Sequence, residues 1–452
     1  MLQIDWGNPK ISIIEFERFL TTYLGSQYDG ILQRANYLQV VTYSPLSPDQ
    51  ENFILDFVSN LNYKPKEFTF PSSKQDAFGN SIFVEPVIIF STHFSNSDHA
   101  DFLWNKQELL NGTVIHDMNS ASMLLSTTTE NGSKAEYQTF RCMQYVGGQG
   151  LEYVMSSVFH EPKVNIRQRL GMKNNASTEG IYFECDENGM HVVCEGVILE
   201  KIPRVDWDDP LDGTGPSRIN LDFTKGNIFI IHYQWLGYGD IEYAVEVGSE
   251  VIKCHTIKHH GILNRPYTQS PSFHGFVSIE NIGETDSPST FRMGCFSVRA
   301  FGGALMGSNT IYASNETTLK PITSSTYTPL IAIRLNTDLK NHEATLERLK
   351  IFSTSAIDIH YELIFNSTII GGTWINMGDG LQKNVSMTSY SGGIEFDGGY
   401  VNKQGEMNTN ATSTFTRMGR YIDGTSNTIL LVAKSLGGTA DVGAVFTLKE
   451  IK

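Results

Sequence analysis

The sequence predicts a mainly β protein, with two antiparallel β-sandwich (jelly-roll-like) blocks and a small N-terminal α-helical or mixed region. Three observations predict this class. Only 18% of the 452 residues are charged, and 40 Gly, 26 Phe and 19 Tyr suit many short strands with glycine turns and aromatic cross-strand pairs. Strand-like runs recur about every ten residues, with Gly, Pro, Asn or Asp between them. A hairpin signal near the middle of the chain, IYFEC and MHVVC separated by DENG, fits the same class.

Residues 1–112 are interpreted as a helical and mixed region that anchors the protein. The run 11–24, ISIIEFERFLTTYL, has apolar residues near a helical period. Ser47 and Gln50 form a capping-box pattern ahead of a second predicted helix, ENFILDFVSNL. The run 98–110, DHADFLWNKQELL, predicts a further helix that ends at an Asn-Gly pair.

Residues 113–303 are predicted to be the central β-sandwich domain. Its clearest strands are NIFIIHY, IEYAVEV and EVIKCHTI, and the first is apolar enough to be buried on both faces. We expect Phe229, Ile231 and Trp235 to lie in its core. Residues 304–328, rich in Ser and Thr, are predicted to be a connector or long loops.

Residues 329–452 are predicted to be a C-terminal β-sandwich domain. The runs LIAIRL, IHYELIF and TILLVAK are its strand candidates, and Gly-Gly pairs separate other segments of this block.

Composition limits the function classes. The net charge of −15 argues against a nucleic-acid surface, because such surfaces depend on clustered Lys and Arg. No run approaches 18 apolar residues, so no membrane span is expected, and the first residues, MLQIDWGNPK, lack the pattern of a signal peptide. The five cysteines have no CxxC spacing and are interpreted as buried free thiols of a protein made in a reducing cytosol. No cofactor is expected.

The segment KCHTIKHHG places Cys254 beside His255, His259 and His260. Thiolate and imidazole are zinc ligands, so metal binding is conceivable here. The segment follows a strand pattern, however, in which four-residue spacing does not bring side chains together. Ordinary strand and loop histidines are the favoured interpretation, and no metal ligand is assigned.

An acidic cluster, DWDDPLDGTG, contains Asp206, Asp208, Asp209 and Asp212. Calcium prefers clustered carboxylate and carbonyl oxygens. The run does not match an EF-hand loop, and its Pro and Gly also suit a solvated turn. The turn is favoured, with calcium binding as the minority alternative.

No catalytic residue is assigned from the sequence. A glycosidase needs two carboxylates close together in a cleft, which spacing alone does not reveal. If the chain were a glycosidase, Glu362, Glu395 and Asp397 in the C-terminal block would be the candidate catalytic carboxylates. The run 232–235, HYQW, could face a sugar, although aromatic residues in strands more often belong to a core.

A series of ordered motifs resembles a known group of proteins. The motifs are RQRLG (167–171), GIYFE (180–184), DGTGPS (212–217), LDFTK (221–225), IFIIHYQWLG (228–237), ENIG (280–283), LIAIRL (330–335), YELIFN (361–366), GTW (372–374) and IDGTS (422–426). Together, over roughly residues 130–452, they resemble virion structural proteins of tailed bacteriophages and of large double-stranded DNA viruses. One departure is the turn GYGDIE (237–242), which is usually more basic and richer in glycine in these proteins.

The resemblance implies a non-enzymatic component of a virus particle, made in the host cytoplasm: a fibre, a spike, or a capsid- or tail-associated protein. It implies other virion proteins as partners and a homo-oligomer, with a trimer favoured. Two alternatives stay open, a receptor protein that binds a host-surface glycan and, with less support, a glycan depolymerase.

Overall fold

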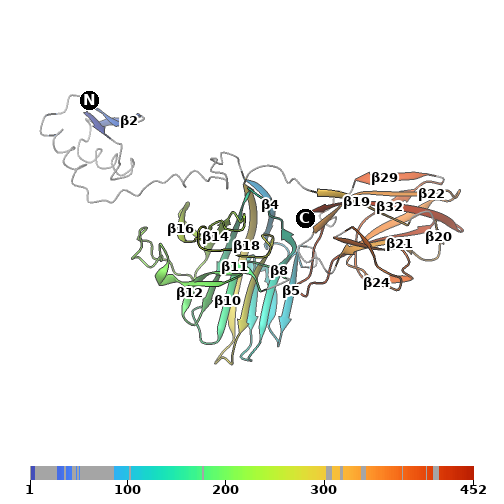
Figure 1. Ribbon diagram of the computed structural model, residues 1–452, viewed down its shortest axis with the longest axis horizontal. Coiled ribbons are helices and arrows are strands. Elements are labelled where there is room, and N and C mark those ends of the chain that lie inside the picture. The colour runs from blue at the N-terminus through green and yellow to red at the C-terminus, as the bar shows by residue number, and fades with distance from the viewer. Residues whose placement is uncertain are drawn as a thin grey trace. The chain divides into compact units, whose positions relative to one another are not determined.

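The structure is a computed structural model. It describes residues 2–5, 28–34, 37–42, 47, 50, 86–100, 103–175, 178–301, 308–315, 319–336, 343–378, 380–403, 405–410 and 417–451. The chain divides into two compact units, Met1–Gln75 and Asp76–Lys452. Nearly all of the regular structure is antiparallel β, as the sequence predicts (Figure 1). No helix in the described part of the chain is long and apolar enough to cross a membrane.

The N-terminal unit contains a three-stranded sheet, in a part of the chain where the sequence predicts a helical or mixed region. The strands are β1 (Leu2–Asp5), β2 (Tyr28–Arg34) and β3 (Tyr37–Thr42), in the order β1-β3-β2. In the β2–β3 hairpin, Ile31 lies opposite Val40 and Leu32 opposite Gln39.

The predicted capping box is present. The Gln50 side chain accepts the Ser47 backbone N–H at 2.9 Å, and the Ser47 hydroxyl accepts the Gln50 backbone N–H at 3.2 Å. The two helices predicted at 11–24 and 51–61 lie outside the described residues.

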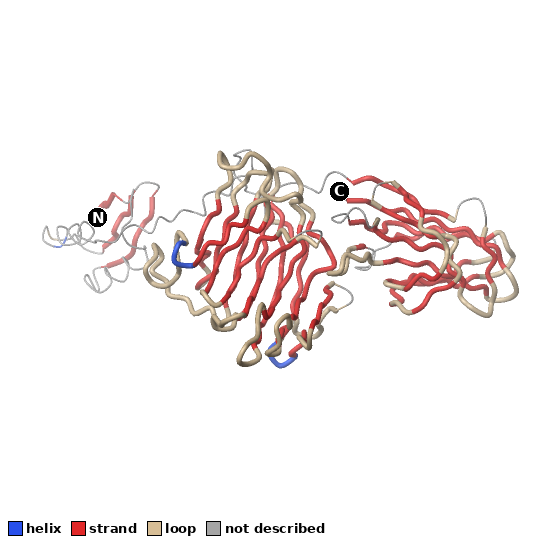
Figure 2. Tube along the Cα trace, turned by 60° about the horizontal axis from the view of Figure 1, so that its bottom comes forward, coloured by secondary structure: helices blue, strands red, loops and turns tan. Residues whose placement is uncertain are grey.

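The central sandwich consists of two face-to-face sheets (Figure 2). The seven-stranded sheet has the order β13 (Leu199–Pro203), β12 (Gly189–Glu195), β11 (Gly180–Asp186), β10 (Ile166–Lys173), β17 (Phe273–Asn281), β8 (Lys134–Met143), β5 (Trp104–Leu109). The eight-stranded sheet has the order β16 (Glu250–Ile257), β15 (Ile241–Val247), β14 (Asn227–Tyr233), β9 (Gly150–Val158), β18 (Ser289–Phe301), β7 (Ser122–Thr127), β6 (Thr113–Asp117), with β4 (Val87–His93) also paired to β18. Two short 3-10 helices, η2 (Met118–Ser120) and η3 (Arg204–Asp206), lie in its loops.

One core of aliphatic and aromatic side chains fills the space between these sheets. Phe229 and Ile231 on β14 are fully buried, as predicted, whereas Trp235 beyond the strand end is only partly buried. Phe183 joins the two sheets, because its ring contacts those of Phe229 and Tyr243, with centroids 5.0 and 5.3 Å away. Such contacts between aromatic rings add to the stabilisation that comes from the buried area.

The central sandwich begins earlier than the predicted residue 113, because β4 and β5 are hydrogen-bonded members of its two sheets. The helix predicted at 98–110 is wrong. Ser97 does cap a turn at His99, but the segment then becomes β5, whose Trp104 is buried and stacked 5.0 Å from Tyr137. Burial of a large aromatic side chain against a neighbouring strand overrides the local helical preference.

The predicted hairpin is formed by β11 and β12. Gly189 adopts a φ of 102°, which suits glycine, while the Asn188 backbone N–H bonds to the Asp186 side chain at 2.7 Å. The turn residues Gly248 and Ser249 both have positive φ, at 58° and 70°, as a tight hairpin between β15 and β16 requires.

The C-terminal sandwich also has two main sheets. One contains β19 (Ser308–Ser314), β32 (Ala440–Ile451), β22 (Glu343–Ser353) and β29 (Glu406–Asn410), with β20 (Lys320–Ile322) on β32 and β30 (Arg417–Met418) on β22. The other has the order β25 (Ile375–Met377), β26 (Leu381–Asn384), β21 (Thr328–Leu335), β31 (Thr428–Ser435), β23 (Ile359–Phe365), β28 (Ile394–Val401), and a two-stranded sheet joins β24 (Thr368–Ile370) to β27 (Ser389–Ser391). The connector predicted at 304–328 is therefore corrected, since β19 and β20 lie within it and pair with β32.

Candidate functional site

The outer face of the seven-stranded sheet carries an ordered array of ionised side chains, here called the charged face. Its members alternate along the strands with core residues: Lys134, Glu136, Arg169, Lys173, Glu184, Asp186 and Lys201. Strand alternation explains the arrangement, because every second side chain of β10 and β11 points away from the core.

Each carboxylate of the charged face contacts cations. Glu184 accepts from Arg169 at 2.5 Å and from Lys201 at 2.6 Å. Glu136 lies 2.9 Å from the Lys134 ammonium and also pairs with Lys173. Burial by itself raises the pKa of Glu184 and of Glu136, but the neighbouring cations outweigh it and hold both pKa values below the usual range. Both groups are therefore ionised at neutral pH.

Two aromatic rings pack within the charged face. Tyr182 and Phe276 meet edge to face, with ring centroids 5.7 Å apart, over Gly171 on the strand between them. A Cβ at Gly171 would lie 2.7 Å from the Tyr182 Cβ, so only glycine lets the rings close. The Arg169 guanidinium and the Lys173 ammonium lie over these rings, 4.8 and 5.3 Å from their centroids. The face is a packed surface with polar groups suited to contacts with another polar molecule.

A second array lies on the outer face of the β21-β31-β23-β28 sheet and is called the aromatic patch: Tyr327, His360, Glu362, Tyr390, Tyr400 and Lys434. The Tyr327 hydroxyl bonds the His360 Nδ1 at 2.7 Å and donates to Glu362. Tyr400 lies beside His360, with ring centroids 4.7 Å apart, and is 66% exposed.

Other side chains shape the electrostatics of the aromatic patch. Lys434 lies 4.5 Å from the centroid of the Tyr327 ring. Burial, with Glu362 and Glu395 adding to it, raises the pKa of Tyr390, so its hydroxyl stays protonated at neutral pH. The patch therefore offers an exposed ring, a carboxylate, an ammonium group and phenolic hydroxyl groups on one surface.

The structure separates the residues of the KCHTIKHHG segment. Cys254 is buried in the core, and His255 pairs with Asp208, whose Oδ2 lies 3.5 Å from its Nδ1. His260 is exposed and lies 3.0 Å from Asp240. Strand alternation in β16 sends neighbouring side chains to opposite faces, so this segment does not converge on one ion.

His259 instead meets two residues that sequence reasoning missed, Cys194 and Glu200. One ligand atom from each of the three lies within 4.8 Å of the others. Burial lowers the pKa of His259, but its bonds to Glu200 and to the Gly239 carbonyl prevail and raise it. Glu200 is 59 residues away in sequence and Cys194 is farther, and both belong to the other sheet, so neither spacing nor strand pairing indicates their position.

The acidic cluster forms separate turns. Asp209 accepts the backbone N–H groups of Leu211 and Ser217, at 3.2 and 2.8 Å. Asp212 caps the turn at Thr214 at 2.8 Å. These carboxylates are engaged by backbone donors, which fits the turn interpretation.

The other two members of the cluster also lie apart. Asp206 ends η3, while Asp208 accepts the Thr256 backbone N–H at 3.0 Å. The four carboxylates thus serve different turns and strands.

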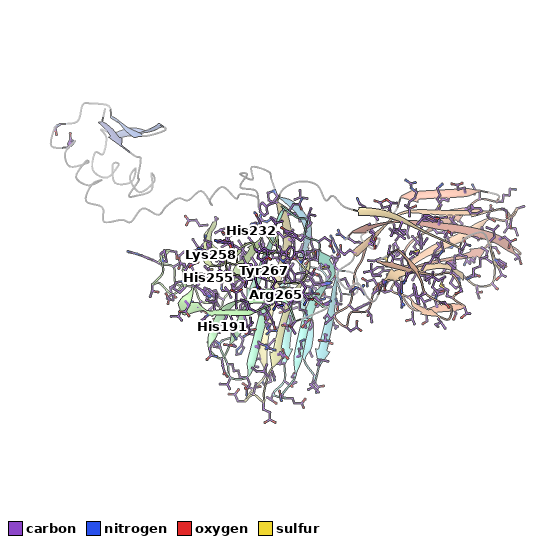
Figure 3. All side chains as sticks on the ribbon, in the orientation of Figure 1. His191, His232, His255, Lys258, Arg265 and Tyr267 are labelled. Carbon is purple, nitrogen blue, oxygen red and sulfur yellow. The ribbon has the colours of Figure 1, made fainter. Side chains whose placement is uncertain are left out.

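The HYQW run belongs mainly to the core. The fully buried Tyr233 donates to the Pro271 carbonyl at 2.7 Å, and the Trp235 indole donates to Thr268 at 2.9 Å. His232 is buried with its ring against Phe301. By strand alternation, the His232 labelled in Figure 3 lies on the outer face of its sheet and not in the core between the two sheets.

The three named carboxylates of the C-terminal block have different surroundings. Glu362 belongs to the aromatic patch, and Glu395 lies near enough to influence Tyr390. Asp397 accepts the adjacent Gly398 backbone N–H at 2.8 Å.

Comparisons with known proteins gave matches among solved structures only. No family model and no curated protein matches the chain. An endo-β-1,4-glucuronan lyase from the fungus Trichoderma reesei is 11% identical, with a TM-score of 0.31, covering 47% of this chain and 95% of that one. A legume lectin-like domain from Entamoeba histolytica is 11% identical, with a TM-score of 0.30, covering 49% and 100%. A family 16 glycosyl hydrolase from Mycobacterium smegmatis is 10% identical, with a TM-score of 0.33, covering 47% and 100%.

Proposed function

We propose that this chain is a non-enzymatic structural component of a virus particle that docks through its N-terminal region and displays its β-sandwiches. The observation that carries the proposal is the position of the residues that resemble virion proteins. Leu170, Phe183, Phe223 and Phe229 come from four of those motifs, and all four belong to the single core of the central sandwich. The motifs thus contribute to the hydrophobic core of the sandwich, and a common core is what related particle proteins would share.

The state of the charged face supports a role without catalysis. Glycoside hydrolysis requires a carboxylic acid that keeps its proton near neutral pH until it reaches the leaving group. Glu136, Glu184 and Asp186 have the opposite property, since neighbouring cations lower their pKa values against the effect of burial. Such carboxylates stabilise a surface and accept hydrogen bonds, and they make poor general acids.

Quantitative mass spectrometry of purified particles tests the structural role. We expect many copies of the chain per particle, retained after the particles are washed at high salt. Immunogold labelling should then place the copies at a fixed position on the particle. Recovery of the chain only from the soluble lysate of infected cells, with none in washed particles, would overturn the proposal.

Carbohydrate binding by the aromatic patch is a second candidate function, favoured by the exposure of Tyr400 beside His360 and Glu362. A sugar ring stacks on an exposed aromatic face, while carboxylate, ammonium and hydroxyl groups bond its hydroxyls. This arrangement combines both kinds of contact on the outer face of one sheet.

A glycan array followed by calorimetry tests this second candidate. Tyr400→Ala should weaken binding of the recognised polysaccharide at least about tenfold, the equivalent of 1.4 kcal/mol. Tyr312→Ala is the matched control, because Tyr312 is 73% exposed on the other sheet of the same sandwich. Equal binding by both variants would exclude the patch. Release of reducing ends by the unaltered protein, abolished in Glu362→Gln, would favour a depolymerase instead.

A further inference from the structure

The edge strands of the two central sheets bring a thiol, a carboxylate and an imidazole together. β12 and β13 form one edge of the seven-stranded sheet, and their register makes Cys194 and Glu200 direct cross-strand partners. Directly paired residues project to the same face of a sheet. His259 follows β16, the edge strand of the eight-stranded sheet. The three side chains meet where these two edges approach each other.

The hydrogen bonds of His259 fix the orientation of its ring and the position of its protons. Its Nδ1 lies 3.1 Å from the Gly239 carbonyl oxygen, which accepts only, so Nδ1 carries a proton. Its Nε2 lies 2.7 Å from a Glu200 carboxylate oxygen. In the neutral imidazole this Nε2 is an acceptor facing another acceptor. The 2.7 Å separation is that of a hydrogen bond, so a proton on Nε2 bridges the two atoms, and a metal ion bound here would replace that proton.

The surroundings hold the three groups in position. The His259 ring is fully buried and stacks on Tyr267, which Figure 3 labels, with ring centroids 4.2 Å apart. The Tyr267 carbonyl accepts the Val197 backbone N–H at 2.8 Å and so fixes the turn between β12 and β13. A Cβ at Gly196 would lie 2.0 Å from that carbonyl oxygen, so the close approach requires glycine.

We propose that Cys194, Glu200 and His259 bind a zinc ion that joins the edges of the two central sheets. Thiolate, carboxylate and imidazole are all ligands of zinc, and a tetrahedral ion would take water as the fourth ligand. The bond from Nδ1 to a backbone carbonyl is the outer contact that orients a metal-binding histidine. Binding replaces the thiol proton of Cys194 and the Nε2 proton of His259 by the ion and releases both protons to solvent. This inference goes beyond the proposed structural role and does not depend on it.

Metal analysis of the full chain, purified without chelators or metal-affinity resins, tests the proposal. We expect about one zinc per chain, reduced at least about tenfold in Cys194→Ser and in His259→Gln. Cys185→Ser and His255→Gln are matched controls outside the trio. Cys185 lies on β11, which neighbours the strand of Cys194, and His255 lies on β16, the strand that precedes His259. Both controls should keep the zinc. Zinc that survives in Cys194→Ser and His259→Gln alike would overturn the proposal.

Cobalt substitution keeps the test decisive if a variant fails to fold. Co²⁺ added to the metal-free full chain should give tetrahedral visible bands and a near-ultraviolet thiolate charge-transfer band. The charge-transfer band should be missing in Cys194→Ser and present in Cys185→Ser. A full chain that takes up neither zinc nor cobalt, while its circular dichroism shows the native β structure, would assign the trio to a protonated imidazole–carboxylate pair and would refute the metal site.

Discussion

His274 on β17 couples the stability of the central sandwich to pH at the scale of one residue. Burial, supplemented by the nearby charges of Lys173 and Arg420, lowers the pKa of His274 to about 4. In the unfolded chain the pKa of this histidine is about 6.5, so between that pH and about 4 the unfolded chain binds a proton at His274 and the native chain does not. The free energy of unfolding must therefore fall as the pH drops from about 6.5 to about 4, by up to about 3 kcal/mol.

His274→Asn should remove much of this pH dependence, because the asparagine amide can still donate to the Thr139 carbonyl that His274 bonds at 2.9 Å. Between pH 7 and pH 5, urea unfolding of the unaltered protein should lose about 2 kcal/mol more than that of the variant. His93→Asn, at an exposed position on β4, is the control and should keep the full slope. Identical slopes in the unaltered protein and His274→Asn would contradict the assignment.

Phe229 illustrates a residue whose role the sequence predicts correctly. It lies fully buried on β14, with its ring 5.0 Å from Phe183 and 5.3 Å from Phe159. Phe229→Ala should lower the free energy of unfolding by about 3–5 kcal/mol, because it removes packing from both sheets and leaves a cavity. Val251→Ala, at a 60% exposed position on β16, should change it by less than about 0.5 kcal/mol. Chemical denaturation followed by tryptophan fluorescence compares the two, and similar losses would count against the core assignment.

Residue-level prediction succeeded where burial follows strand alternation and failed where contacts join distant segments. Phe229 and Ile231 sit inside a long apolar run, which indicates a core. The partners of His259 could not be predicted, because Cys194 and Glu200 belong to a different sheet edge. The charged face did leave a signal, namely charges that occur only at alternate positions in RQRLGMK and FECD.

At the scale of elements, the strands that form continuous runs of apolar and β-branched residues were predicted most accurately. β14, β15, β16 and β23 coincide with the predicted runs NIFIIHY, IEYAVEV, EVIKCHTI and IHYELIF. The segment of β5 was misread, because its helix-like spacing is a local feature while its actual structure depends on pairing with β8. Pairing between strands that are distant in sequence is the part of the fold that is hardest to predict from one sequence.

The ion pairs that cross β10, β11, β12 and β13 test how the charged face stabilises its sheet. Glu184→Gln removes the negative charge that Arg169 and Lys201 share, leaving partly buried cations without their counter-ion. We expect the free energy of unfolding to fall by about 3 kcal/mol. Glu242→Gln is the control, because Glu242 is 38% exposed and 3.7 Å from Lys253, and it should cost less than about 1 kcal/mol. Equal, small effects would show that the charged face contributes little to stability.

At the scale of the whole molecule, one segment of the C-terminal sandwich bonds to the central one. The Arg420 backbone N–H donates to the Phe140 carbonyl at 3.0 Å, and Ile422 donates to the Asn105 side chain at 2.9 Å. The Tyr421 ring meets that of Phe140 edge to face, with centroids 4.7 Å apart. These contacts join β5 and β8 to the segment after β30, so the two sandwiches belong to one compact unit.

The N-terminal unit, residues 1–75, is the natural place to test docking in the proposed particle role. The remaining unit contains the complete sheets and cores of both sandwiches, so its strands keep every partner after the deletion. We expect a chain lacking residues 1–75 to fold, with unchanged near-ultraviolet circular dichroism, but to be absent from purified particles. The unaltered chain should be retained in them.

The oligomeric state completes this test. The resemblance to virion proteins favours a trimer, and light scattering of the full chain should then give about three times the 50.5 kDa of one chain, in line with closed symmetry. A truncated chain that folds, stays trimeric and is lost from particles places docking, and not trimer formation, in residues 1–75. A truncated chain that still enters particles in normal amount would refute the docking role, and a full chain that stays monomeric both in solution and on the particle would refute the trimer.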